Sequence, residues 1–475
     1  MKKIFSLLLL CCFVSLHART DIRNILFSGK VHDGNSGIAG IAVTDGVNIT
    51  YTGVNGQYQL LSNASAEFVY ITLPSGYDVP LNNGVPGFYV PVNDKSKQEQ
   101  IINFEVRKSD RDDYRHTMIV WADPQVYFEE ELPLAASAAK DVEALNRQSH
   151  TPVFGVVCGD IVGDHPEHYD AIIKILNSTH IPFFFAPGNH DMTLNVRSDE
   201  LSKDTFKAIF GPDYYSFNRG KIHYVVLDDV FYVGRDYLYI AYLPEKQLAW
   251  LQQDLAGVPA GSTVAVILHI PTSTRKTETR ENMHNVLQNR RYLYEMLKPY
   301  KAHIFSGHTH YNDNFVINDN LYEHVHAAVC AEFWQTPQCS DGTPQGYGVY
   351  EINGNDVKWY YKSVGYDKNF QFRAYPAGYN SEKPTAVTVN VWNYDPQWKI
   401  HWYENGTLKG EMTQYFGNDP YTKDYIVKNR HKFRYDWITT SITGHLFFAE
   451  PSLPDAEIII EVIDRFDNKY IEKLK

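Results

Sequence analysis

The spacing of apolar residues divides the chain into three regions. Between residues 26 and 107, short runs alternate apolar and polar positions and are separated by turn sequences such as Asp45-Gly46, a pattern typical of β-hairpins. No helical spacing competes there, so we expect a small, immunoglobulin-like β-sandwich. Alternation returns after residue 366, for example in 385–392 and 458–462, and predicts a C-terminal β-rich domain over 366–475.

The middle region, residues 113–365, has a different pattern. Apolar runs of strand length alternate with stretches in which apolar residues recur every three or four positions. This alternation predicts an α/β layered domain. The helices expected from the spacing are Leu134–Gln148, His168–His180, Ser202–Phe210, Glu245–Leu255 and Glu281–Leu297.

The first 18 residues resemble a targeting segment. Lys2 and Lys3 precede an apolar run of 11 residues, 4–14, which is shorter than the roughly 20 residues that a membrane span needs. We therefore expect a secretory signal peptide over 1–18, with lipid attachment at Cys11 or Cys12 as the alternative. No later apolar run reaches the length of a membrane span.

Charge and cysteine content narrow the possible functions. The chain has 475 residues, 44 of them basic and 56 acidic, for a net charge of -12. Binding to a nucleic-acid polymer is not expected, because that requires a basic surface. Three cysteines remain after the leader, too few for a disulfide-framed fold. Cys330 and Cys339 could still pair, whereas Cys158 ends an apolar run and is expected to be buried.

Five apolar runs of the middle region end in residues that can bind a metal ion. Functional groups of α/β enzymes gather at the carboxyl ends of strands, so we expect these residues to meet. Carboxylates, an amide and imidazoles suit two divalent ions, which could be Mn, Fe, Zn or Mg. The residues are Asp123, Asp160, the triplet Asn189-His190-Asp191, His269, and the triplet His308-Thr309-His310.

The order of these motifs resembles that of the calcineurin-like metallophosphoesterases. The matching segments are Asp123-Pro124-Gln125, Gly159-Asp160 with the later Asp164, Gly188-Asn189-His190-Asp191, His269, and Gly307-His308-Thr309-His310. The resemblance implies a four-layer α/β/β/α sandwich for 113–365. The flanking β domains are similar to those of secreted bacterial members, which implies a location in the periplasm or cell envelope.

The resemblance also implies roles for individual residues. It implies hydrolysis of a small phosphate mono- or diester by a hydroxide that bridges two divalent metal ions. His190 would assist the leaving group, with Asp164 and Asp191 as candidates to orient it. The expected metal ligands are Asp160 between the ions, Asp123 and His310 at one ion, and Asn189, His269 and His308 at the other. Gln125 stands where the family usually has histidine, so it would be a weaker ligand or would support one.

Residues after the last ligand motif are candidates for substrate binding. Aromatic side chains there could stack on a nucleobase or a sugar, and packing between domains is the alternative. These candidates are Phe333, Trp334, Asp341 and Tyr347. The basic residues Arg275, Lys276 and Arg280 could meet a substrate phosphate or lie on a solvated helix face.

A second function class stays open at this point. The replacement at Gln125 would also fit an envelope protein that binds a glycan or another ligand through a degenerate metallophosphoesterase core. Metal content distinguishes the two functions, because only the enzyme needs both ions. The pattern of residues leaves the oligomeric state and the natural substrate open.

Overall fold

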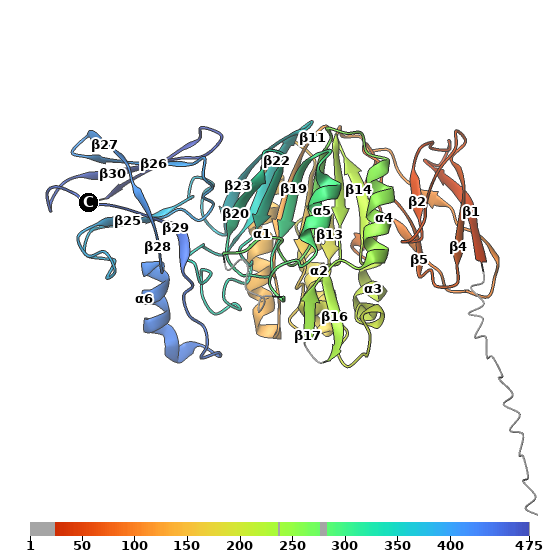
Figure 1. Ribbon diagram of the computed structural model, residues 1–475, viewed down its shortest axis with the longest axis horizontal. Coiled ribbons are helices and arrows are strands. Elements are labelled where there is room, and N and C mark those ends of the chain that lie inside the picture. The colour runs from red at the N-terminus through yellow and green to blue at the C-terminus, as the bar shows by residue number, and fades with distance from the viewer. Residues whose placement is uncertain (1–23, 236–237, 276–282, 475) are drawn as a thin grey trace, which may run out of the picture.

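Three units lie in a row in the computed structural model, which describes residues 24–235, 238–275 and 283–474. Figure 1 shows a β domain at each end and the α/β domain between them. The expected signal peptide, 1–18, lies outside the described residues. Among the helices that the structure describes, none is long and apolar enough to cross a membrane.

The N-terminal domain is a pair of four-stranded sheets with a shared core. In β4, buried Tyr58, Leu60 and Ser62 alternate with exposed residues, as expected for a strand with one face on the core. The immunoglobulin-like strand order stays a prediction. One sheet contains β1 (Asn24–His32), β4 (Gln57–Asn63), β9 (Glu99–Ile101) and β10 (Phe104–Glu105), and the other contains β2 (Ala42–Thr44), β3 (Ile49–Tyr51), β5 (Phe68–Ile71) and β8 (Tyr89–Pro91).

Two sheets face each other in the middle domain. The first has the order β13-β12-β11-β22-β23, and the second has the order β14-β15-β18-β19-β21-β20. The first contains β11 (Arg115–Trp121), β12 (Val153–Cys158), β13 (Phe183–Ala186), β22 (Gly346–Asn353) and β23 (Asp356–Ser363). The second contains β14 (Tyr215–Arg219), β15 (Ile222–Val226), β18 (Thr263–Ile267), β19 (Lys301–Ser306), β20 (Asp313–Asn318) and β21 (Leu321–Val325).

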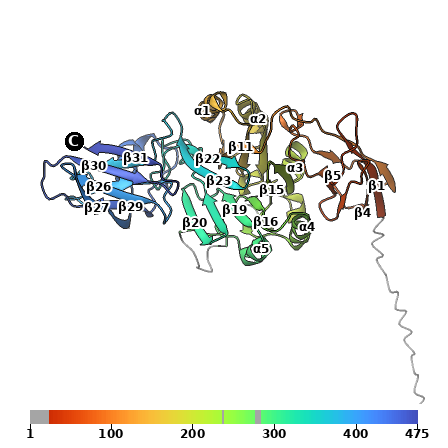
Figure 2. The same ribbon diagram turned by 90° about the horizontal axis from the view of Figure 1, so that it is seen from above.

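Helices cover the outer faces of both sheets, which confirms the four-layer arrangement. Figure 2 shows α1 and α2 beyond the first sheet and α4 and α5 beyond the second. Strand β11 shows how one sequence serves two layers: Met118 and Val120 join the core between the sheets, whereas Ile119 and Trp121 pack in the core with α1 and α2. This alternation follows from the two-residue period of a strand.

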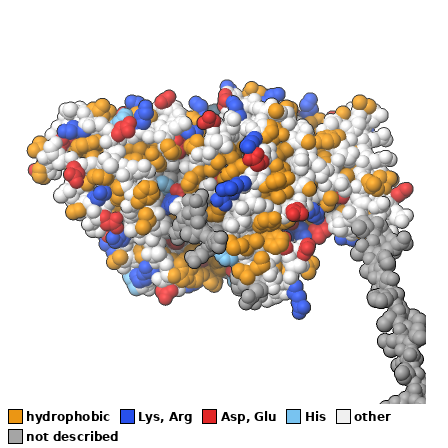
Figure 3. Space-filling model, in the orientation of Figure 1, with side chains coloured by type: hydrophobic (Ala, Val, Ile, Leu, Met, Phe, Trp, Pro, Cys, Tyr) orange, Lys and Arg blue, Asp and Glu red, His pale blue; other side chains and the backbone are white. Residues whose placement is uncertain are grey.

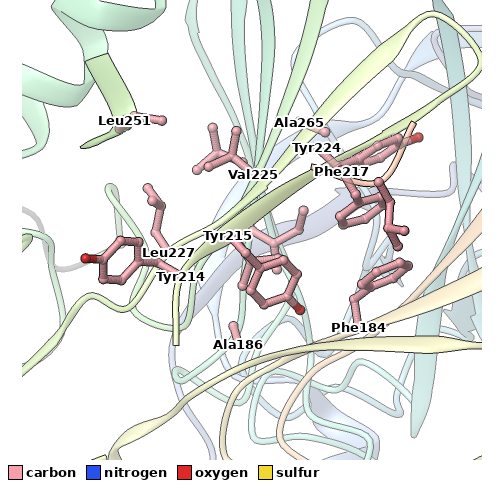
Figure 4. Close-up of a cluster of buried hydrophobic side chains, with 14 of the residues drawn as sticks. Phe184, Ala186, Tyr214, Tyr215, Phe217, Tyr224, Val225, Leu227, Leu251 and Ala265 are labelled. Carbon is pink, nitrogen blue, oxygen red and sulfur yellow. The ribbon is translucent and has the colours of Figure 1, made fainter. Parts of the chain in front are cut away.

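Aromatic stacking fills the space between the two sheets. Phe184 of the first sheet stacks on Phe217 of the second, with ring centroids 3.8 Å apart, and Phe217 stacks on Tyr224 at 4.9 Å. Figure 4 shows this cluster together with Tyr215 and Ala265. The packed interior holds the two sheets together, so the loops at one end of both sheets are fixed relative to each other.

Four of the five expected helices form close to their predicted positions. The fifth, expected over 281–297, begins at Arg290, and residues 281–282 lie outside the described part of the chain. The amides of Leu287 and Gln288 donate to the carbonyls of Pro271 and Ala241, so this segment is held by tertiary hydrogen bonds instead of helical ones. The helices are α1 (Leu132–Gln148), α2 (Tyr169–Asn177), α3 (Asp204–Phe210), α4 (Glu245–Ala256) and α5 (Arg290–Leu297).

The C-terminal domain contains two four-stranded sheets and one helix, α6 (Pro420–Asn429). Val389, Ile460 and Val462 lie in the core between the sheets. The sheets have the orders β24-β25-β29-β28 and β27-β26-β30-β31. Their strands are β24 (Arg373–Tyr375), β25 (Val387–Asn390), β26 (Lys399–Glu404), β27 (Thr407–Glu411), β28 (Thr413–Gly417), β29 (Thr443–Ala449), β30 (Ile458–Ile463) and β31 (Lys469–Leu474).

A buried ion-pair cluster centred on Arg275 joins the α/β and C-terminal domains. Its guanidinium lies 2.7 Å from Asp313 and 2.8 Å from Asp341, and it stacks on the ring of Tyr311 at 4.0 Å. His445 of β29 approaches Asp313 at 3.1 Å. Arg275 is therefore neither a phosphate ligand nor part of a solvated helix face, and both of those expectations were wrong.

We expect Arg275→Ala to lower the free energy of unfolding by about 3–5 kcal/mol, because it leaves two buried carboxylates without their cation. The midpoint of urea unfolding measures this loss. Arg291→Ala, at an exposed position of α5, is the matched control. Equal midpoints for both variants would show that the cluster contributes little to stability.

Candidate active site

The candidate metal-binding motifs all lie at the carboxyl ends of strands of the two sheets. Asp123 and Asp160 follow β11 and β12, and Asn189 begins the short 3-10 helix after β13. His269 follows β18, and His308 follows the neighbouring β19. Because both sheets end at the same side of the domain, these five loops meet, as the sequence predicts.

Several lone pairs converge on one nitrogen in this cluster. The Nε2 atom of His269 lies 2.9 Å from Oδ1 of Asn189, 3.1 Å from Nδ1 of His308 and 3.3 Å from Oδ1 of Asp160. A single ring nitrogen can donate only one proton, so it cannot satisfy three acceptors. Lone-pair atoms that converge in this way are typical of metal ligands. The candidate ligand atoms of Asp160, His269 and His308 all lie within 4.8 Å of one another.

Asp123 and His310 form the other half of the cluster. Oδ1 of Asp123 lies 3.7 Å from Nε2 of His310. The Asp123 carboxylate is fully buried and accepts the backbone amide of His308 at 2.9 Å. Burial raises the pKa of Asp123 to about 8, because a desolvated carboxylate disfavours its charged form. A nearby cation would stabilise that charge, so the residue fits a metal site.

Backbone carbonyls fix the orientation of two histidine rings. Nδ1 of His269 donates to the carbonyl of Cys158 at 2.7 Å, and Nδ1 of His310 donates to the carbonyl of Ala331 at 3.0 Å. Each bond holds the proton on Nδ1 and leaves Nε2 as the donor atom for a metal. His308 is reversed: its Nε2 faces Oδ1 of Asn285 at 2.9 Å, and its Nδ1 points into the cluster.

Close backbone approaches explain the glycines of the motifs. A Cβ atom on Gly159 would lie 2.6 Å from Nδ1 of His269, and one on Gly307 would lie 2.5 Å from the carboxylate of Asp123. The loops are also strained, since non-glycine residues with positive φ are uncommon and cluster at functional sites. Positive φ angles occur here at Asp123, Gln125, Asp160, Asp164, His308, His310, Ala331, Phe333 and Trp334.

His190 lies beside the metal-binding cluster and is held by two side chains. Its Nδ1 is 2.9 Å from Oδ1 of Asp164 and 3.3 Å from the hydroxyl of Tyr127. Burial lowers the pKa of His190, but the negative charges of Asp160 and Asp164 outweigh it and raise the pKa to about 9. The two carboxylates therefore favour the protonated imidazole, and Nδ1 is the nitrogen that both Asp164 and Tyr127 contact.

Asp191 does not orient His190, which corrects one of the two expected partners. Its carboxylate accepts the backbone amides of Gly188 at 2.8 Å and Ile161 at 3.1 Å, and the hydroxyl of Tyr169 at 2.9 Å. These bonds tie the loop after β13 to the loop after β12. Asp191 thus holds the backbone that carries Asp160, while Asp164 provides the carboxylate that contacts the imidazole.

Gln125 occupies a buried position next to the cluster. Its Nε2 donates to Oδ2 of Asp160 at 3.3 Å, and its backbone amide donates to the Asp160 carbonyl at 2.9 Å. In this rotamer the amide supports Asp160, which is one of the two roles we expected. A direct role of Gln125 as a metal ligand stays a prediction.

The cluster opens into a cavity of about 270 Å³. Phe333 is the only one of the four expected substrate residues that lines it, and its ring stacks on His310 with centroids 4.8 Å apart. The cavity is lined by Gln125, Asp160, Asn189, His190, Tyr239, His308, Thr309, His310, Glu332, Phe333 and Ser340.

The other three expected substrate residues serve the fold, which corrects those predictions. Trp334 packs against the core that the first sheet forms with α1 and α2, and it donates its indole N–H to the carbonyl of Pro124 at 2.9 Å. Tyr347 is fully buried and donates to Asp141 at 2.8 Å. Asp341 is the buried partner of Arg275. The alternative, packing between structural layers and domains, holds for these three.

Cys158 is buried, which confirms the expectation for this residue. Cys330 and Cys339, which could have paired, are both free and buried in this structure. Lys276 and Arg280 lie outside the described residues.

Sequence reasoning missed four residues at the site. Tyr127 contacts His190, Tyr239 lies with its ring 6.2 Å from that of His308, and Glu332 is a buried cavity residue. Trp437 of the C-terminal domain packs on Phe333. Tyr127, two positions after Gln125, could have been found from its nearness to the first motif. Glu332 could likewise have been found from its place next to Phe333. Tyr239 and Trp437 carry no such signal, because only the fold brings them to the cavity.

Comparison with known proteins matches three parts of the chain to one family. Residues 122–312 match the family model for calcineurin-like phosphoesterases, residues 26–109 match the model for the N-terminal part of such proteins, and residues 323–470 match the model for their C-terminal part. A solved dimetal phosphatase from Danio rerio superposes with a TM-score of 0.40 at 13% identity, over 52% of this chain and 96% of that one.

Curated relatives align with part of the chain. Serine/threonine-protein phosphatase CPPED1 from Bos taurus is 31% identical over 201 residues, 39% of this chain and 61% of that protein. Its counterpart from Danio rerio is 31% identical over 198 residues, 39% of this chain and 62% of that protein. The chain thus spans about three fifths of the length of these relatives. Because the three family models together follow the chain from residue 26 to residue 470, it belongs to the calcineurin-like phosphoesterases.

Proposed function

We propose that this protein hydrolyses phosphate esters with the help of two divalent metal ions. The observation that carries the proposal is the convergence of donor atoms around Nε2 of His269, which a proton alone cannot satisfy. Family membership supports the same reaction class. The name phosphatase of the CPPED1 relatives supports phosphate monoesters ahead of diesters.

The donor set fits two ions. Asp123 and His310 would hold one, with Gln125 as its expected further neighbour. Asn189, His269 and His308 would hold the other, and Asp160 lies between the two groups. Divalent ions bound here would neutralise phosphate charge and lower the pKa of water toward neutrality. The two buried carboxylates would be compensated at the same time.

The chain's own residues supply the proton needed at the leaving group. The carboxylates of Asp160 and Asp164 favour the protonated form of His190, and its Nδ1 is held by Asp164, so Nε2 would be the nitrogen available to the leaving oxygen. Donation of that proton as the ester bond breaks would avoid the release of an alkoxide. Tyr127, on the same Nδ1, limits the rotation of the ring.

Acidic surface charge is compatible with an anionic substrate in this arrangement. Figure 3 shows acidic and basic side chains interspersed over the face that it draws. The net charge of -12 therefore does not form a uniform repulsive field there, and the local charge of the site is set by the ions and their ligands.

Metal loading and a substrate panel test the proposal together. We expect about two ions per chain by elemental analysis after loading with Mn, Zn, Fe or Mg. The loaded protein should release p-nitrophenol from its phosphate monoester faster than from bis(p-nitrophenyl) phosphate, and a chelator should abolish both activities. Fewer than one ion per chain, without hydrolysis of either ester, would overturn the proposal and favour a ligand-binding protein with a degenerate core.

A further inference from the structure

A segment of the C-terminal domain, residues 430–441, is fixed at the mouth of the cavity. The guanidinium of Arg434 stacks on the ring of Phe128 at 3.6 Å and pairs with Glu130 at 2.6 Å. The backbone amide of Ser441 donates to the carbonyl of Ser340, a cavity residue, at 3.0 Å. The C-terminal segment therefore lies directly beside the cavity, although the residues that line the cavity belong to the α/β domain.

Two aromatic residues of this segment continue the aromatic wall of the cavity. The ring of Phe333 meets the edge of Trp437 at 4.8 Å and that of Tyr435 at 5.9 Å. Tyr435 and Trp437 stack on each other at 5.2 Å. Since Phe333 also stacks on His310, a continuous row of rings leads from a metal-binding histidine to the surface. We call Phe333, Tyr435 and Trp437 the aromatic rim.

Exposure increases along this row. His310 is 8% exposed, Phe333 is half-buried, and Trp437 is 54% exposed. A large indole left this exposed loses much of the free energy that its burial would contribute. The exposed surface lies next to a reaction centre, where a substrate can cover it.

The backbone around Trp437 is held in place by Arg430. Its guanidinium donates to the carbonyl of Asp436 at 2.8 Å and to that of Ile438 at 2.6 Å, one on each side of Trp437. The backbone that carries the indole is therefore held before any ligand arrives, which reduces the entropy lost on binding.

We propose that the aromatic rim binds a planar aromatic ring in the leaving group of the phosphate ester. This inference rests on the proposed function, because it places the phosphate at the metal-binding cluster and the ring beyond Phe333. An aromatic side chain can stack on planar rings of different kinds and with different substituents, since every such ring has a π-face. The preferred substrates would be aryl or nucleobase-containing phosphate esters.

Kinetics with two leaving groups test the rim. We expect Trp437→Ala to lower kcat/KM for 1-naphthyl phosphate by roughly 5- to 150-fold, with a much smaller loss for glycerol phosphate, which has no ring. Trp437→Phe should restore most of the naphthyl activity, because it returns a flat ring. The control is Phe416→Ala, at a 76% exposed aromatic residue of the same domain, which should behave like the wild-type protein.

The outcomes separate this inference from the proposed function. If the wild-type protein hydrolyses neither ester, the proposed function is wrong. If the wild-type protein hydrolyses both and Trp437→Ala affects both equally or neither, only the rim is wrong. Glucose 6-phosphate is assayed as a third ester. If Trp437→Ala loses as much activity toward it as toward 1-naphthyl phosphate, the rim binds a sugar and the proposed preference for an aromatic ring is wrong.

Discussion

Replacing Asp160 by asparagine is expected to lower kcat by roughly 1,000-fold or more and to reduce the metal content below two ions per chain. Asp160 is the carboxylate between the two donor groups, and several kcal/mol of charge stabilisation depend on the ions it would hold. The loss should come mainly from charge. The asparagine side chain retains an oxygen that can accept the amide of His190, as Oδ1 of Asp160 does at 2.8 Å, although its NH2 group cannot accept Nε2–H of Gln125 as Oδ2 does.

Elemental analysis and turnover of an aryl phosphate measure the two effects on the same samples. Asp170→Asn makes the same chemical change at an exposed position of α2 and should leave both quantities at wild-type values. An Asp160→Asn protein that is folded, carries two ions and turns over normally would remove Asp160 from the metal site. Circular dichroism establishes the folding of each variant.

The convergence of the candidate metal ligands could be predicted because each one follows a strand directly. Asp160 ends the apolar run 153–159, and His269 ends 264–268, so local sequence places both side chains at strand ends. Parallel pairing brings such ends together within each sheet. The packing of the two sheets on each other then brings the ends of β12 and β18 to one side of the domain. For the same reason the layered α/β domain could be predicted from alternating strand and helix periods.

The prediction was wrong for three of the four substrate residues, because the direction of these side chains is not set by the local pattern of strands. Trp334 and Phe333 are adjacent aromatics in one loop, yet Phe333 lines the cavity and Trp334 packs below the sheet. Their directions depend on positive φ angles at 331, 333 and 334, which no hydrophobic pattern encodes. Trp437 was missed because its contact with Phe333 depends on how the C-terminal domain docks.

The roles of charged residues also depend on partners far away in the chain. Asp341 forms an ion pair with Arg275, and both were candidates for substrate contact. A carboxylate and a guanidinium in loops look the same in sequence whether they face a ligand or each other. Asp191 is a similar case, since its carboxylate accepts the backbone amide of Ile161, which lies 30 residues earlier in the chain, and a motif alone does not reveal that contact.

The second large effect is expected for His190→Ala, which should reduce kcat by roughly 100- to 10,000-fold while the metal content stays near that of the wild-type protein. The side chain of His190 contacts Asp164 and Tyr127 through Nδ1, and it is absent from the donor group formed by Asp160, His269 and His308. Its removal therefore takes away a proton donor and leaves the ligands in place.

The dependence on the leaving group identifies that role. An alkyl phosphate releases a strongly basic alkoxide and should lose the most activity in His190→Ala, whereas p-nitrophenyl phosphate releases a stable anion and should lose the least. Asp164→Asn should give a smaller loss in the same direction, because it only weakens the hold on the imidazole and its charge. His150→Ala, at an exposed histidine, is the control. Proton donation predicts that the loss of activity rises with the basicity of the departing oxygen. Equal losses for both esters, or loss of both ions, would instead make His190 a ligand or a support of the metal site.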